Sequence, residues 1–128
     1  MSGSINEVTL VGNLTRNPEL RHTSNKKPVC IMGLATNRNW TDENGERHEE
    51  AEYHRIVAFD KLAETCHRYL KKGRKIWARG RLHYHAYTGQ DSGEKFSAEI
   101  VLEKMEFLDS TPQDVKEALN VTTAQQVQ

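Results

Sequence analysis

Basic and aromatic side chains alternate along one stretch of the chain, KIWARGRLHYHAY at residues 75–87. Every second position from Lys75 to Tyr87 carries a cation, a histidine or an aromatic ring, while the positions between them are mostly apolar. A period of two predicts a β-strand with one apolar and one polar face. Such a polar face suits a single-stranded nucleic acid, because cations meet phosphates while rings stack on unpaired bases. A solvated face or a subunit contact would carry the same pattern, so the stretch alone leaves these alternatives open.

The overall charge neither requires nor excludes a nucleic-acid partner. The 128 residues include 18 Lys and Arg and 18 Asp and Glu, so the formal net charge is zero, and a binder of this kind must concentrate positive charge locally. The N-terminus has no signal-peptide features and no apolar run reaches membrane-spanning length, so we expect a cytoplasmic protein with no membrane partner. Cys30 and Cys66 lie far apart without a CxxC motif, which predicts reduced thiols.

The strands that would position this stretch follow from the rest of the sequence. A first strand is predicted at residues 5–14, with a bend or bulge at Gly12, and a short extended piece at 19–21. Residues 29–39 and 49–59 form a second and a third strand, which a long hairpin joins. Its tip carries Asn44-Gly45, for which we expect a type I′ turn, because that turn needs positive φ at both central positions.

One helix is expected between residues 60 and 73, capped by Asp60 and closed by Gly73. Residues 75–87 are then the fourth strand and 96–108 the fifth, with a core-facing set of Phe96, Ala98, Ile100 and Leu102. This order is the layout of the OB-fold. We therefore predict an all-β fold with one helix: a five-stranded Greek-key OB-fold barrel with a long hairpin between its second and third strands and the helix between its third and fourth. The domain spans 1–109, and a polar, flexible tail follows at 110–128, where a short helix at 111–119 is the weaker alternative.

Five segments between residues 6 and 108 carry a resemblance to a known family. They are VTLVGNLTRNPELR, LATNRNW, EYHRIVAFDKLAE, YLKKGRKIWARGRL and EIVLEKMEFL. Together and in this order they resemble the bacterial and organellar single-stranded DNA-binding proteins. The resemblance implies a homotetramer that binds and protects single-stranded DNA without sequence preference, in replication, recombination and repair. It also implies a nucleoid-associated protein without a cofactor.

In that family four aromatic residues stack on bases, and the resemblance assigns this role to Trp40, Tyr53, Phe59 and Tyr87. Tyr53 and Tyr87 stand where Trp is common, which should tune the affinity without abolishing binding. Phe59, at a strand end, could equally pack in the core. The cations expected to meet phosphates near these rings are Arg38, Arg55, Lys61, Lys71 and Lys72. Arg55 is the firmest of them, because it shares a strand face with Tyr53 and Phe59.

The outer part of the fourth strand departs from the family in charge. Basic residues are frequent in the family where this chain has Glu7, His83, His85 and Ala86, so we expect a less positive groove at neutral pH. Histidine gains a proton in mild acid, so DNA affinity should rise there through His83 and His85. A metal site at these two histidines is not expected, since no further ligand follows at a recognisable spacing.

The inner part of the same strand is assigned to subunit contacts. In the family the segment around Trp77 faces another subunit, and Glu99 and Glu103 are expected to pair with Arg79 and Arg81 across the strands. His54 lies near a subunit contact by the same resemblance, and is otherwise a packing residue. The predicted oligomer interface consists of His54, Lys75, Trp77, Arg79 and Arg81.

Two other functions fit the same fold. A primosome accessory protein, similar in family to primosomal replication protein N, would use the barrel mainly for protein contacts. An RNA-binding OB module would stack bases equally well, but aromatics at all four positions favour single-stranded DNA. No nucleophile elbow, phosphate-binding glycine loop or HExxH motif is present, so we expect no enzyme. The chain ends in AQQVQ, not in the acidic tip through which many bacterial members recruit partners, so recruitment of replication proteins stays open.

Overall fold

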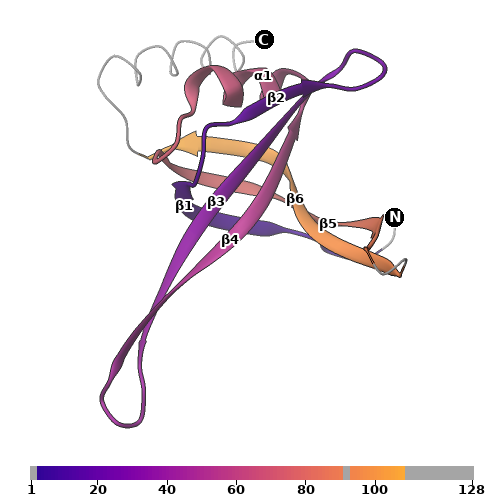
Figure 1. Cartoon of the computed structure of the whole chain (residues 1–128). Coiled ribbons are helices and arrows are strands. Elements are labelled where there is room, and N and C mark those ends of the chain that lie inside the picture. Colours follow the sequence, from indigo (N-terminus) through magenta and orange to yellow (C-terminus); the bar gives the residue numbers. More distant parts are fainter. Residues whose placement is uncertain (1–2, 91–92, 109–128) are drawn as a thin grey trace.

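The described part of the computed structural model, residues 3–90 and 93–108, consists of strands and one helix (Figure 1). In chain order the elements are β1 (Val8–Leu14), β2 (Glu19–His22), β3 (Pro28–Thr41), β4 (Arg47–Phe59), α1 (Asp60–Tyr69), β5 (Lys75–Thr88) and β6 (Glu94–Phe107). Neighbouring strands follow the order β1-β5-β6-β4-β3-β2, and β1 also pairs with β3. Five strands therefore close into a ring, and β2 adds to it along β3. The predicted five-stranded barrel with one helix between β4 and β5 is confirmed.

The core lies inside this ring, because alternate strand residues point inward. Apolar side chains from β1, β3, β4, β5 and β6 are buried there, and α1 covers one end with Ala63 and Cys66. Burying one Leu or Ile side chain contributes about 1.5–3 kcal/mol, so these strands hold one another in place through their inner faces. The buried strand residues of the core are Leu14, Cys30, Met32, Leu34, Ile56, Ala58, Ile76, Ala78, Ile100 and Leu102.

Two glycines allow the backbone to pack closely where the ring closes. A Cβ atom at Gly12 would overlap the carbonyl oxygen of Ala35, and one at Gly80 would overlap that of Val101. At Gly12 the sequence predicted a bend or bulge, but β1 pairs with β5 without interruption on either side of it. The glycine instead allows β1 to approach the backbone of β3 closely. The irregularity lies instead between β5 and β6, where Glu103 is the extra residue.

The ends of α1 differ from the prediction. Asp60 is the first helical residue, with φ of +58°, and Phe59 is the N-cap without a side-chain hydrogen bond. The chain passes directly from β4 into the helix without a connecting loop, so the change in chain direction occurs at Asp60. The helix ends at Tyr69, and Gly73, with φ of +92°, belongs to a later turn that the Arg74 N–H closes onto the Lys71 carbonyl.

Two hairpins, β3–β4 and β5–β6, extend away from the barrel (Figure 1). On β5–β6 the inner face continues outward past Ile100, with Tyr84 opposite Ala98 and Ala86 opposite Phe96. Phe96 is 65% exposed and Ala98 is also exposed, so the prediction that both point into the core is wrong. Both residues lie on the same strand face as Ile100, as predicted. They are exposed because the β5–β6 hairpin extends beyond the barrel, where no other strand covers this face.

The predicted tail at 110–128, the domain end at 109 and the alternative helix at 111–119 lie outside the described residues. Within the described part, no helix has the length and apolar character needed to cross a membrane.

Candidate nucleic-acid interface

Six of the predicted DNA contacts lie on the outer face of the sheet. Directly opposite residues of a sheet share a face, and His83 is opposite Glu99 while Val57 is beside Val101. The odd-numbered residues of β4 and β5 therefore point outward on either side of β6. Tyr53, at 75% exposure, Phe59, at 44%, and Tyr87, at 46%, present their rings to solvent. The six residues are Tyr53, Arg55, Phe59, His83, His85 and Tyr87.

Glu99 on β6 joins the two sides of this outer face. Its Oε2 accepts a hydrogen bond from Arg55 Nε at 3.3 Å, and its Oε1 is 3.3 Å from His83 Nδ1. The Glu99 side chain is only 15% exposed. A carboxylate held between two of the predicted phosphate contacts lowers the positive charge that Arg55 offers to DNA.

The ion pairs predicted for the arginines of β5 are therefore wrong. The extra residue Glu103 shifts the register, so Arg79 is opposite Lys104 and Arg81 is opposite Val101. The nearest carboxylate recorded for Arg79 is Glu7, at 4.0 Å. Sequence reasoning paired Glu99 with an arginine of β5, its antiparallel neighbour. It missed the contact of Glu99 with Arg55 on β4, the parallel neighbour on the other side of β6.

Trp40 lies on the opposite face of the β3–β4 hairpin from Tyr53. On β4, Tyr53 is an odd-numbered residue, whereas His48, which lies opposite Trp40, is an even-numbered one. Because successive side chains of a strand point to opposite faces, Trp40 and Tyr53 lie on opposite sides of the hairpin. The guanidinium carbon of Arg38 is 4.7 Å from the Trp40 ring centroid, a cation–π contact. The His48 ring stacks on Trp40 with a centroid distance of 5.2 Å and an interplanar angle of 21°.

A loop of residues 42–46 forms the tip of this hairpin, and Asp42 organises it. Asp42 Oδ1 accepts the N–H groups of Asn44 and Glu46, each at 2.9 Å, and the Gly45 N–H donates to the Asp42 carbonyl at 3.1 Å. Gly45 has φ of +81° but Asn44 is not in the positive-φ region, so the predicted type I′ turn is wrong. The Asp42 side chain favours this loop by taking the backbone N–H groups.

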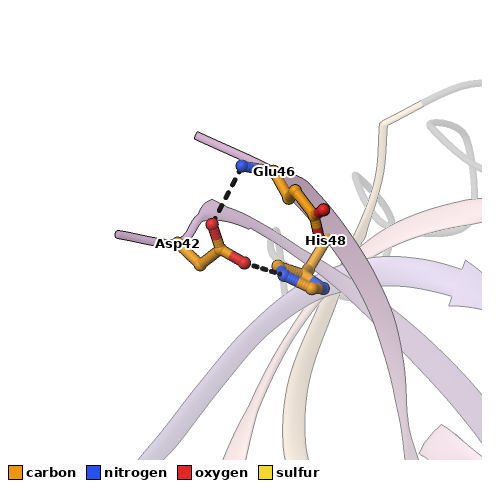
Figure 2. A group of neighbouring side chains, drawn as sticks. All are labelled: Asp42, Glu46 and His48. Atoms are coloured by element: carbon orange, nitrogen blue, oxygen red, sulfur yellow. Dashed lines mark hydrogen bonds and ion pairs between the residues drawn. The ribbon is translucent and has the colours of Figure 1, made fainter. Parts of the chain in front are cut away.

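The second oxygen of Asp42 contacts His48 (Figure 2). The distance from His48 Nε2 to Asp42 Oδ2 is 2.8 Å. This hydrogen bond, followed by the one from the Glu46 N–H, lowers the pKa of the Asp42 carboxyl below its ordinary value. Sequence reasoning missed His48, because a two-residue turn at Asn44-Gly45 would have put Glu49 opposite Trp40.

The three predicted lysine contacts lie at the helix end of the barrel. Lys61 is in the first turn of α1, and Lys71 and Lys72 follow the helix, all exposed to solvent. The Lys72 backbone N–H donates to Asn17 Oδ1 at 2.9 Å. The structure does not group these lysines with Arg55 and His83, although Lys61 follows Phe59 closely along the chain.

The residues predicted for subunit contacts lie in two places. Lys75, Trp77, Arg79 and Arg81 share the outer face of β5, and the guanidinium of Arg79 is 5.8 Å from the ring centroid of the half-buried Trp77. His54 is on the inner face of β4, where its Nε2 lies 2.9 Å from the hydroxyl of Thr36. His54 thus has a hydrogen-bond partner in its own chain.

A family model described as the single-strand binding protein family matches residues 5–108. The chain is 41% identical over 105 residues to the single-stranded DNA-binding protein of Neisseria meningitidis serogroup A, covering 82% of this chain and 60% of that protein. The corresponding protein of Xanthomonas axonopodis pv. citri is 41% identical over 108 residues, covering 84% of this chain and 60% of its own length. The chain thus spans about 60% of the length of these relatives.

Two solved structures are similar in sequence and fold. The structure of Plasmodium falciparum SSB complexed with ssDNA has a TM-score of 0.78 and 30% identity, covering 85% of this chain and 99% of that one. A deletion mutant of the single-stranded DNA binding protein from Thermus aquaticus has a TM-score of 0.74 and 30% identity, covering 86% of this chain and 53% of that one.

Proposed function

Because the chain belongs to the single-strand binding protein family, we propose that it binds single-stranded DNA without sequence preference. Aromatic rings would hold the bases apart while cations neutralise phosphates and release counterions. The observation that carries the proposal is the set of exposed rings on one outer sheet face, Tyr53, Phe59 and Tyr87, beside Arg55. Such binding protects unpaired strands in replication, recombination and repair without catalysis.

The proposed path of the DNA uses both faces of the β3–β4 hairpin. Tyr53 and Trp40 point to opposite sides, so one strand contacts both rings only by passing around the hairpin, or by meeting them in different subunits. Arg38 would support the strand at Trp40. His83 and His85 would contact it on β5, and Lys61, Lys71 and Lys72 would contact phosphates beyond Phe59.

A homotetramer in the cytoplasm, associated with the nucleoid, completes the proposal. The bacterial relatives support this location. The outer face of β5 supports assembly, since half-buried Trp77 is opposite Val11, an exposed apolar residue of β1. The proposed contact residues are His54, Lys75, Trp77, Arg79 and Arg81. A solution mass four times the 14.7 kDa of one chain is expected.

A competition experiment tests the function. The protein is bound to labelled poly-dT and challenged with duplex DNA and with poly-U over a range of salt concentrations. We expect poly-dT to be retained against duplex DNA and poly-U, with an affinity that falls as salt rises. Preference for poly-U would favour an RNA-binding module. Failure to bind any single strand at low salt would contradict the proposal and favour an accessory protein that acts through protein contacts.

A further inference from the structure

The tip of the β3–β4 hairpin gathers three side chains of kinds that bind metal ions. They are Asp42, Glu46 and His48, and one ligand atom from each lies within 4.8 Å of the others. All three belong to the short loop and the first residues of β4. The proposed contacts with DNA do not use them.

The loop holds two of these ligands in place. Asp42 Oδ1 is occupied by two backbone N–H groups, so Oδ2 is directed at His48 (Figure 2). The stack on Trp40 fixes the plane of the His48 ring. Its Nε2 lies 2.8 Å from Asp42 Oδ2. Two tetrahedral ligands bound at roughly 2.0–2.2 Å to one ion are separated by about 3.4 Å, so an ion can replace this hydrogen bond once the two atoms move apart by about 0.6 Å.

Glu46 supplies the third ligand from the same loop. Its N–H donates to Asp42 Oδ1 and its carbonyl accepts from the Asp42 N–H, both at 2.9 Å. The backbone of Glu46 is therefore fixed relative to Asp42, while its exposed side chain is free to change rotamer. One of its carboxylate oxygens already lies within 4.8 Å of the other two ligand atoms, so a rotamer change would bring it to an ion between Asp42 and His48.

We propose that Asp42, Glu46 and His48 form a site for a divalent transition-metal ion, represented by Zn²⁺. One imidazole with two carboxylates suits zinc, whereas Mg²⁺ and Ca²⁺ prefer sites made of oxygen ligands alone. The local charge also favours a cation, because residues 42–50 carry five Asp and Glu residues and only one Arg. Three protein ligands leave one coordination position open.

The ion would join the start of the tip loop to the first residues of β4 and lower the negative charge beside Trp40. The open position could accept a phosphate oxygen from a strand stacked on that ring. This consequence rests on the proposed DNA binding, whereas the metal site itself does not.

Calorimetric titration of the full chain with zinc chloride, in the absence of DNA, tests the site. We expect one ion per chain, reversed by a chelator, with no competition from Mg²⁺ or Ca²⁺. Glu46→Gln and His48→Gln should each weaken zinc binding at least about tenfold, since even the loss of an outer-shell partner costs about 10- to 100-fold. The matched control is His67→Gln, which removes an exposed histidine of α1 and should leave zinc binding unchanged.

Glu46→Gln keeps both backbone hydrogen bonds to Asp42, so a loss of zinc binding in this variant does not come from a lost turn. Zinc binding that persists in both ligand variants, that falls equally in the His67→Gln control, or that Mg²⁺ matches would overturn the proposal. Any of these results would leave the DNA-binding proposal untouched.

Discussion

Glu99 is the residue that most limits the proposed interface. Its carboxylate accepts a hydrogen bond from Arg55 and lies beside His83, on the face that carries the exposed Tyr53 and Tyr87. A phosphate that approaches Arg55 has to compete with this carboxylate. The outer face is therefore weaker as an anion site than its basic residues alone would indicate.

We predict that Glu99→Gln strengthens binding of single-stranded DNA. An ion pair with partly exposed partners contributes about 0.2–1 kcal/mol, so releasing Arg55 should raise the affinity by up to about fivefold. Fluorescence titration with poly-dT at fixed salt measures this change. The control is Glu103→Gln, which removes the same charge from an exposed position of β6. An equal gain in both variants would mean that overall charge, and not Arg55, is responsible.

Stacking gives a second prediction for single residues. Trp40→Ala and Tyr87→Ala should each weaken single-strand binding by about 1–3 kcal/mol for each base that loses its ring. Tyr84→Ala is a matched control, because Tyr84 is 64% exposed on the same strand as Tyr87 but on its other face. Titrations with poly-dT give the affinities, and circular dichroism checks the fold. Unchanged affinity in both test variants would mean that neither ring contacts the DNA.

At the scale of the elements, the closure of the ring depends on Gly12. This residue of β1 faces the backbone of β3, and an added methyl group would meet the Ala35 carbonyl oxygen. Backbone cannot move aside as a flexible side chain does. Gly12 therefore sets how closely β1 and β3 approach.

We expect Gly12→Ala to destabilise the barrel by at least about 1–3 kcal/mol, the usual cost of overpacking. Urea unfolding followed by circular dichroism measures the free energy of unfolding. Thr9→Ala changes an exposed residue of the same strand and serves as the control. Equal stability of Gly12→Ala and the unchanged chain would show that β3 can retreat from β1.

The elements themselves were largely predictable from the sequence. Alternation located the strands. An apolar stripe at helical spacing, formed by Leu62, Cys66 and Tyr69, located the helix, because both patterns are local. The tip turn was not predictable from Asn44-Gly45, since the Asp42 side chain competes for the same backbone N–H groups. The outward position of Phe96 depends on where the barrel ends, which no local pattern records.

The candidate site was only partly predictable, for a related reason. The resemblance supplied the aromatic positions, and alternation correctly put Tyr53, Arg55 and Phe59 on one face. The contact between Arg55 and Glu99 depends on the parallel pairing of β4 with β6, two strands far apart in the sequence. The place of His48 under Trp40 depends on a register set by the turn.

At the scale of the whole molecule, two buried thiols couple stability to pH. Burial raises the pKa of the Cys30 thiol to about 11. Burial, and secondarily the neighbouring Cys30, raises the pKa of the Cys66 thiol further. An unfolded thiol ionises near pH 8.5. The unfolded chain therefore loses these protons first, so this contribution to stability is complete below about pH 8.5 and declines as pH rises towards the folded-state values.

We predict that the free energy of unfolding falls between pH 9 and pH 10.5, by up to about 1.4 kcal/mol per pH unit for each thiol. Urea unfolding at several pH values measures the slope. Cys66→Ala should be less stable at pH 7, because it leaves a cavity, but its stability should decline less steeply above pH 9. If the free energy of unfolding fell equally steeply above pH 9 in the unchanged chain and in Cys66→Ala, ionisation of Cys66 would not be a cause of the decline.

The ring of strands also sets the order in which the protein can fold. Val8 of β1 pairs with Gly80 of β5, so β1 is synthesised well before the strand with which it pairs. The β3–β4 hairpin can form meanwhile from neighbouring residues. Contacts between distant parts of a chain slow folding, often to milliseconds or seconds. During synthesis, closure of the barrel must therefore be a late event, and β1 stays without its β5 partner until then.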